Sequence, residues 1–173
     1  MPQLCLGRIS RGIWLASAIC IAGPSDAVAQ APQRVVSLNL CADQFLLALG
    51  DRSQIASLSP LARDPEISFL AEAASRLPVN DGKGESILFG GADLVLAGAF
   101  GQQARTALLT RQGLDVLSLA PWSSFADGRE QIRMVAARLG HPERGEALIG
   151  EIDAALARTK DIVPGGRSIL VYY

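Results

Sequence analysis

The chain has 173 residues, of which 49% are hydrophobic and 19% charged, and its formal net charge at pH 7 is −1. This balance excludes the strongly basic surface typical of nucleic-acid binding, so we expect no nucleic-acid partner. A single histidine also excludes the multi-histidine sites of zinc and manganese binders.

The first 29 residues have the pattern of a cleavable export signal. A basic start is followed by a short apolar core and by small residues suited to cleavage. These parts are Arg8 with Arg11, residues 13–22, and Ala27-Val-Ala29. The apolar core is about half of the roughly 20 residues that a membrane span needs. We predict cleavage after Ala29, with Ala31 as the alternative, and hence a periplasmic protein.

Cleavage would leave 14 basic and 16 acidic residues, a net charge of −2. It would also remove Cys5 and Cys20, so that Cys41 remains without a partner for an internal disulfide. Cys41 is about a hundred residues from the single histidine, His141. We therefore expect Cys41 to be a small buried side chain at the start of a helix, not a nucleophile.

Between residues 34 and 119, short apolar runs alternate with helical patterns. The predicted strands are 34–38, 54–58, 94–97 and 116–119, and the predicted helices are 41–49, 64–74, 85–89 and 102–112. We expect Gly50 and Gly113 to end their helices, Gly50 as a left-handed cap, and Pro65 to lie just inside a helix start. Strands that are apolar throughout indicate burial on both faces. The predicted fold is therefore α/β, a parallel sheet with helices on both faces.

After residue 121 the pattern becomes helical. Ser124 can cap a helix that reaches residue 139, or Asp127 can do so in a capping box with Glu130. A second helix, 142–162, would be roughly 30 Å long, enough to pass from one lobe to another. Residues 167–173 are predicted to be a strand. An apolar strand of a parallel sheet needs neighbours, so we expect the chain to be a fragment that lacks its second lobe.

Motifs of catalysis are missing from the sequence. No Gly-x-Ser-x-Gly motif occurs, and Gly82-x-Gly84 lacks the third glycine and the preceding strand of a dinucleotide-binding turn. The carboxylates do not cluster as metal ligands do. We therefore assign no catalytic residue, no metal site and no cofactor. The informative feature is the loop after the first strand, because ligands of open α/β sheets bind at the carboxyl ends of strands.

Several of these segments together resemble the amino-terminal lobe of a periplasmic substrate-binding protein of an ABC importer, in the class that binds vitamin B12 and iron-siderophores. The resemblance covers residues 34–173. It rests on Arg34-Val-Val-Ser-Leu-Asn39 with its helix, Glu85-Ser-Ile-Leu88 ahead of Ala92-Asp-Leu-Val-Leu-Ala-Gly98, Gly113-Leu-Asp-Val-Leu-Ser-Leu119, and the long final helix. It implies two similar lobes, a rigid helix between them, a ligand held in the cleft, and no catalysed reaction.

This resemblance also implies a domain division and a set of ligand contacts. Residues 30–140 would form the amino-terminal lobe, 141–163 the interlobe helix and 164–173 the start of a truncated second lobe. The residues expected to face the ligand are Ser37, Leu38, Asn39, Gly98, Ala99, Phe100, Pro121 and Trp122. Aromatic faces with a few polar groups suit a metal chelate or corrinoid: an iron-siderophore, haem or cobalamin. As alternatives, Trp122 and Phe100 only cover the end of the sheet, and Asn39 only forms a turn.

In the family, an acidic residue at the place of Glu85 pairs with arginines of the membrane permease. An acid in the first turn of a helix is also favoured by the helix dipole alone, which is the alternative role of Glu85. We expect a monomeric solute receptor that meets an ABC permease at the membrane surface. The alternative function is an exported α/β enzyme whose catalytic residues lie in the missing carboxyl-terminal part, and a third possibility is a truncated product without activity.

Overall fold

The computed structural model describes residues 30–159. Four short strands in this range form one sheet in which all neighbouring strands are parallel, in the order β2-β1-β3-β4. The strands are β1 (Val35–Ser37), β2 (Ile55–Ser57), β3 (Leu94–Gly98) and β4 (Val116–Leu119). The predicted parallel sheet is confirmed.

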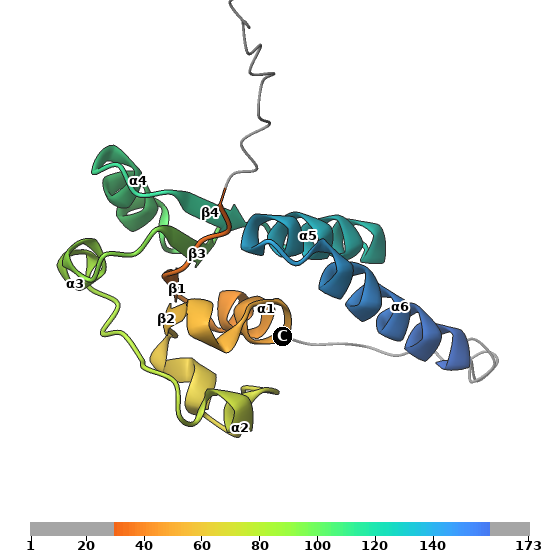
Figure 1. Ribbon diagram of the computed structural model, residues 1–173. Helices are drawn as coiled ribbons and strands as arrows, with labels where there is room; N and C mark the ends of the chain where they lie inside the picture. The colour runs from red at the N-terminus through yellow and green to blue at the C-terminus, as the bar shows by residue number, and fades with distance from the viewer. Residues whose placement is uncertain (1–29, 160–173) are drawn as a thin grey trace, which may run out of the picture.

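Helices cover both faces of this sheet, as predicted (Figure 1). Helices α1 and α5 lie on one face, and α3 and α4 lie on the other. The α-helices are α1 (Leu40–Leu49), α2 (Ala71–Ala74), α3 (Gly84–Phe89), α4 (Gln103–Arg111), α5 (Phe125–Leu139) and α6 (Pro142–Thr159). Two short 3-10 helices, η1 (Arg52–Gln54) and η2 (Pro60–Arg63), flank β2.

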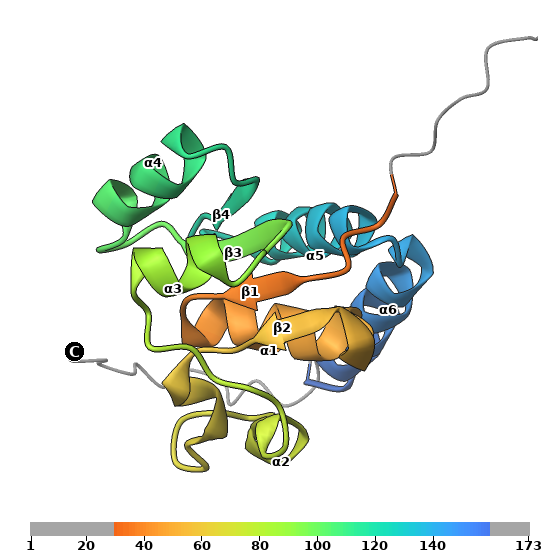
Figure 2. The ribbon, with the colours of Figure 1, turned by 60° about the vertical axis from the view of Figure 1, so that its left-hand side comes forward.

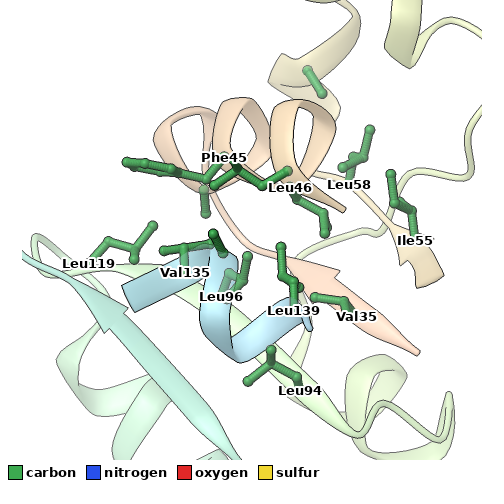
Figure 3. Close-up of a cluster of buried hydrophobic side chains, with 14 of the residues drawn as sticks. Val35, Phe45, Leu46, Ile55, Leu58, Leu94, Leu96, Leu119, Val135 and Leu139 are labelled. Carbon is green, nitrogen blue, oxygen red and sulfur yellow. The ribbon is translucent and has the colours of Figure 1, made fainter. Parts of the chain in front are cut away.

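Each face of the sheet has its own apolar cluster. The larger cluster joins the sheet to α1 and α5, where Leu46 and Leu139 are fully buried (Figure 3). The smaller cluster joins the opposite face to Ile87 of α3 and Leu109 of α4. Successive strand residues point to opposite faces, so a strand buried on both sides is mainly apolar, and a polar residue in it needs a hydrogen-bond partner. β3 is apolar throughout, and β1 is apolar except for Ser37 at its end.

The strand order reverses direction between β1 and β3. From β1 the chain passes through α1 to β2 on one side, and then returns to place β3 on the other side of β1 (Figure 2). Ligands of open α/β sheets bind in the crevice outside such a reversal, at the carboxyl ends of the strands. The loops that follow β1 and β3 therefore occupy the position where a binding crevice is expected.

The predicted helix at 64–74 is wrong. The structure has η2 just before this segment, turns through residues 64–70, and the one-turn helix α2 only at Ala71–Ala74. One helical turn does begin here, since Asp64 Oδ1 accepts from the Glu66 N–H at 2.9 Å and the Asp64 carbonyl accepts from the Ser68 N–H at 2.8 Å. The segment is then held by a long-range contact, in which Ser68 Oγ accepts from Gln44 Nε2 of α1 at 3.0 Å.

Two predicted helix-end details also need correction. Gly50 has φ −85° and ψ 161°, which is extended and not left-handed, and glycine is needed because a Cβ would lie 2.9 Å from the Leu46 carbonyl oxygen. At the start of α5, Ser124 is the N-cap and its Oγ accepts from the Asp127 N–H at 3.1 Å. The alternative capping box of Asp127 with Glu130 is therefore wrong.

The last two helices meet at a sharp turn. Gly140 ends α5 with φ 86°, in the left-handed region, and Pro142 begins α6 as predicted. Helix α6 packs on α5 near this turn and then runs outward (Figure 1). The predicted export signal, the end of the second helix beyond Thr159 and the strand at 167–173 lie outside the described residues.

Candidate ligand-binding site

An open hollow of about 1000 Å³ lies at the carboxyl ends of β1, β3 and β4, and we refer to it as the sheet-end hollow. Six of the eight residues predicted to face a ligand line it: Asn39, Gly98, Ala99, Phe100, Pro121 and Trp122. Its other lining residues come from the segment after β2, from the end of β4 and from helices α1, α5 and α6. They are Cys41, Gln44, Phe45, Ala48, Phe69, Leu70, Leu119, Ala120, Gln131, Ile132, Arg144, Ala147, Leu148, Glu151 and Ile152.

Trp122 is held firmly although half of its surface is exposed. Its Nε1 donates to Gln131 Oε1 at 2.9 Å, and Gln131 Nε2 in turn donates to the Ala120 carbonyl at 2.9 Å. The indole and the ring of Phe45 lie in an edge-to-face arrangement, with a centroid distance of 6.1 Å and an interplanar angle of 68°. Gly128 of α5 lies under the six-membered ring. A tryptophan fixed on several sides with half of its surface free is suited to receive an apolar ligand.

The loops after β1 and β3 fit together through Asn39 and Gly98. Asn39 is the N-cap of α1, and its Oδ1 accepts from the Ala42 N–H at 3.0 Å. Its amide lies so close to β3 that a Cβ at Gly98 would be 2.1 Å from Asn39 Nδ2. The glycine therefore permits this contact, and Asn39 has a structural role whether or not it also contacts a ligand.

Ser37 and Leu38, the two remaining predicted contacts, do not line the sheet-end hollow. Ser37 is fully buried, and its Oγ donates to the Asn39 carbonyl at 3.2 Å. Leu38 is buried in the smaller apolar cluster, and its carbonyl accepts from Gln102 Nε2 at 3.2 Å. Both residues therefore stabilise the loop after β1 through buried contacts.

Phe100 and Phe69 are the most exposed aromatic side chains of the sheet-end hollow, with exposed fractions of 76% and 94%. Phe100 is one of the predicted ligand contacts, whereas Phe69 is not, because it falls inside the helix wrongly predicted at 64–74. The signal was an aromatic residue in the segment after β2, whose carboxyl end lies at the same edge of the sheet.

Cys41 is exposed and lines the sheet-end hollow, so the expectation of a buried thiol is wrong. The buried apolar residues of α1 are Ala42, Phe45, Leu46 and Leu49, at the spacing of one helical stripe. Cys41 falls outside this stripe. Among residues 30–159, no group of three or more His, Cys, Asp or Glu side chains is placed to hold a metal ion.

A buried carboxylate lies beneath the site. Asp43 is fully buried, and it accepts hydrogen bonds from the Ser59 N–H at 2.9 Å and from Ser59 Oγ at 2.5 Å. Burial raises the pKa of Asp43 above its ordinary value, and the hydrogen bonds from Ser59 partly offset this effect. Asp43 thereby ties α1 to the segment after β2.

Two charged residues line the sheet-end hollow, Arg144 and Glu151 of α6. Arg144 is already paired, since its guanidinium donates to Asp51 Oδ1 at 2.6 Å and to the Leu49 carbonyl at 3.2 Å. The hydrogen bond from Arg144 lowers the pKa of the Asp51 carboxyl. The lining is otherwise apolar or uncharged, which suits a ligand with large apolar faces.

Glu85 lies away from the sheet-end hollow, exposed in the first turn of α3. The start of this helix is held by Asp81, which accepts from the Lys83 N–H at 3.0 Å and from Ser86 Oγ at 3.2 Å. The Lys83 N–H bond lowers the pKa of Asp81. In the described part of the chain no salt bridge involves Glu85.

No helix between residues 30 and 159 is long and apolar enough to cross a membrane.

Comparison with known proteins bears on this site. The chain resembles a periplasmic haem-binding protein from Pseudomonas aeruginosa, with a TM-score of 0.63, 22% identity, and coverage of 75% of this chain and 46% of that one. The haem-binding protein RhuT from Roseiflexus sp. RS-1 has a TM-score of 0.63 at 27% identity, with coverages of 76% and 50%. For the vitamin B12 binding protein BtuF of Vibrio cholerae the TM-score is 0.60 at 20% identity, with coverages of 75% and 50%.

The chain thus spans about half the length of these similar proteins. None of the curated proteins matches it. A family model described as periplasmic binding protein matches residues 35–173, most of the sequence. The α/β lobe with its sheet-end hollow therefore belongs to the periplasmic binding protein family.

Proposed function

We propose that this chain is the amino-terminal part of a periplasmic receptor that delivers a metal chelate or corrinoid to an ABC importer. One observation carries the proposal. Residues from the loops after β1, β3 and β4, far apart in the sequence, converge around a single open hollow at the carboxyl edge of the sheet. This is where open α/β sheets bind ligands. The family consists of binding proteins and not of enzymes, so the alternative of an exported α/β enzyme is set aside.

The ligand class is supported by the lining of the sheet-end hollow and by the similar proteins. Phe100 and Trp122 offer exposed aromatic faces, and the lining is largely uncharged. The similar structures include haem binders and a vitamin B12 binder. We extend this chemistry to the present chain as a ligand class: an iron-siderophore, haem or cobalamin.

The remaining parts of the proposal follow from this assignment. Residues 1–29 would export the protein to the periplasm and be removed. Residues 30–140 would form one lobe, 141–163 the helix to a second lobe, and 164–173 the start of that lobe. The receptor would act as a monomer, and Glu85 would meet the ABC permease. Ser37 and Leu38 would support the ligand loop, whereas Phe100 and Trp122 would touch the ligand.

A binding panel tests the proposal. The complete gene product, without its export signal, is titrated with haemin, cyanocobalamin and a ferric hydroxamate siderophore. Maltose is the control solute. We expect a Kd in the micromolar range or tighter for at least one metal compound and no binding of maltose. Failure to bind any of the three metal compounds would contradict the proposed function.

A further inference from the structure

Phe69 is an aromatic side chain that is almost fully exposed to solvent. Its exposed fraction is 94%, yet it lines the sheet-end hollow and not an outer convex surface. Burying a phenylalanine side chain contributes about 1.5–3 kcal/mol, and Phe69 forgoes almost all of this in the described residues. Single exposed apolar residues are common and need no explanation by themselves. What distinguishes Phe69 is that it lines the same hollow as two other exposed aromatic residues, Phe100 and Trp122.

The segment that leads to Phe69 is anchored to α1 and to the larger apolar cluster. Ser59 is tied to the buried carboxylate of Asp43, and Ala62 is fully buried in the larger apolar cluster. Ser68, the neighbour of Phe69, is buried and accepts a hydrogen bond from Gln44 Nε2 of α1 at 3.0 Å. Phe69 is therefore held on a fixed segment and not on a loose loop tip, so little ordering entropy would be lost when a ligand meets it.

Three aromatic residues then surround the sheet-end hollow from three separate segments. Phe69 comes from the segment after β2, Phe100 from the loop after β3, and Trp122 from the loop after β4. All three are half exposed or more. Flat aromatic rings make their largest contacts with flat apolar faces.

We propose that Phe69 is a ligand-contacting residue that, with Phe100 and Trp122, selects a planar metal macrocycle, haem or a corrinoid, over a compact iron chelate. This inference rests on the proposed function and makes it more specific. A macrocycle presents a broad apolar face that several rings can touch at once, whereas a compact hydroxamate chelate presents mainly polar edges. The hollow of about 1000 Å³ has room for such a ligand.

The test compares two phenylalanines of similar exposure. Phe69→Ala removes the proposed contact, and Phe89→Ala is the matched control, because Phe89 is 90% exposed at the end of α3 and does not line the hollow. Phe69→Tyr keeps the ring. The mature protein and each variant are titrated with haemin, cyanocobalamin and ferrichrome, followed by the visible absorption of the metal compound. Thermal unfolding without ligand is measured alongside.

We expect the wild-type protein to bind haemin or cyanocobalamin more tightly than ferrichrome. The separate titrations with haemin and cyanocobalamin identify which macrocycle the protein binds. Phe69→Ala should raise the Kd for that macrocycle about tenfold, equal to about 1.4 kcal/mol. Phe89→Ala and Phe69→Tyr should stay within about twofold, and the unfolding temperature of Phe69→Ala should not fall.

The outcomes separate this inference from the proposed function. Binding of a macrocycle with an unchanged Kd in Phe69→Ala overturns the role of Phe69 and leaves the receptor function standing. Preference for ferrichrome overturns the planar ligand class only. A lower unfolding temperature in Phe69→Ala without ligand would mean that another part of the protein packs on this ring, which also overturns the inference. If the wild-type protein binds none of the compounds, the proposed function fails and the inference fails with it.

Discussion

The indole ring of Trp122 rests on Gly128, one turn into α5: a Cβ at position 128 would lie 3.1 Å from Cε3 and 3.2 Å from Cδ2 of the ring. A glycine inside a helix costs about 1 kcal/mol relative to alanine. The contact with Trp122 explains why glycine stands at this place, because any side chain there would push the ring out of position.

Gly128→Ala tests this contact against Gly150→Ala. Gly150 lies in α6, and a Cβ there would meet nothing within 4 Å. We expect Gly150→Ala to raise the free energy of unfolding by up to about 1 kcal/mol. Gly128→Ala should gain clearly less or lose stability, and should shift the emission of Trp122. Equal gains in urea unfolding with unchanged emission would show that the ring does not depend on Gly128.

Asp43 predicts a pH-dependent stability difference. Because burial raises its pKa above 3.8, the folded protein holds this proton more tightly than the unfolded chain does. The resulting stability is fully present below about pH 3.8 and is lost as the pH rises through the raised pKa. Asp43→Asn removes the charge and keeps an oxygen that can accept from the Ser59 N–H.

We therefore expect the stability of Asp43→Asn minus that of the wild type to increase from pH 4 to pH 7. Urea unfolding at several pH values measures this difference, and other carboxylates cancel because both proteins share them. Asp43→Ala, the control, leaves the Ser59 groups unpaired and should cost about 1–3 kcal/mol. A difference that is constant with pH, or one that shrinks toward neutrality, would contradict the raised pKa.

Trp122 is predicted to supply part of the ligand affinity. Trp122→Ala in the mature protein should weaken binding of its metal compound by about 1–3 kcal/mol, the effect of removing an aromatic anchor. Trp122→Phe keeps an aromatic face but leaves Gln131 Oε1 without its donor, so a smaller loss is expected. The control is Phe125→Ala, since Phe125 is 59% exposed and does not line the hollow. Calorimetric affinity that is unchanged in Trp122→Ala would leave Trp122 with a packing role.

The sheet and most of the site could be predicted from the sequence, because strands buried on both faces are mainly apolar, as β1 and β3 are. Once the strands are known to be parallel, their carboxyl ends must meet at one edge. This geometry predicts that Asn39, Phe100 and Trp122 lie close together, and all three line the sheet-end hollow. The sequence alone does not distinguish these lining residues from the buried Ser37 and Leu38, because the direction and burial of adjacent residues at a strand end depend on the three-dimensional structure.

The place of Phe69 after β2 was a signal in the sequence, but the exposed position of its side chain could not be predicted, because it depends on long-range contacts. The segment after β2 is shaped by the bond between Ser59 and Asp43, 16 residues apart, and by the bond between Ser68 and Gln44, 24 residues apart. The periodicity of a sequence does not reveal such pairs, and the sequence therefore predicts a helix that begins near Pro65. The exposure of Cys41, in contrast, could have been predicted from the sequence, since Cys41 is not part of the apolar stripe of α1, which begins at Ala42.

Glu85 predicts a defect in transport without a defect in binding. It is exposed at the start of α3, outside the sheet-end hollow, and Asp81 already holds the start of that helix. An exposed acid that pairs with arginine contributes modestly, often under about 1 kcal/mol, so reversing its charge is the sharper change. We expect Glu85→Arg to leave the Kd for the ligand unchanged and to cost at most about 1 kcal/mol of stability through the helix dipole.

Uptake of the ligand through the cognate permease should fall in cells that express Glu85→Arg at the wild-type level. Glu72→Arg is the matched control, because Glu72 is also an exposed acid in the first turn of a helix, on α2. If the docking proposal holds, Glu72→Arg supports normal uptake, and an Arg→Glu change in the permease restores uptake to Glu85→Arg. Normal uptake by Glu85→Arg itself would leave this residue as a helix-start acid, favoured by the dipole of α3 and by nothing on the permease.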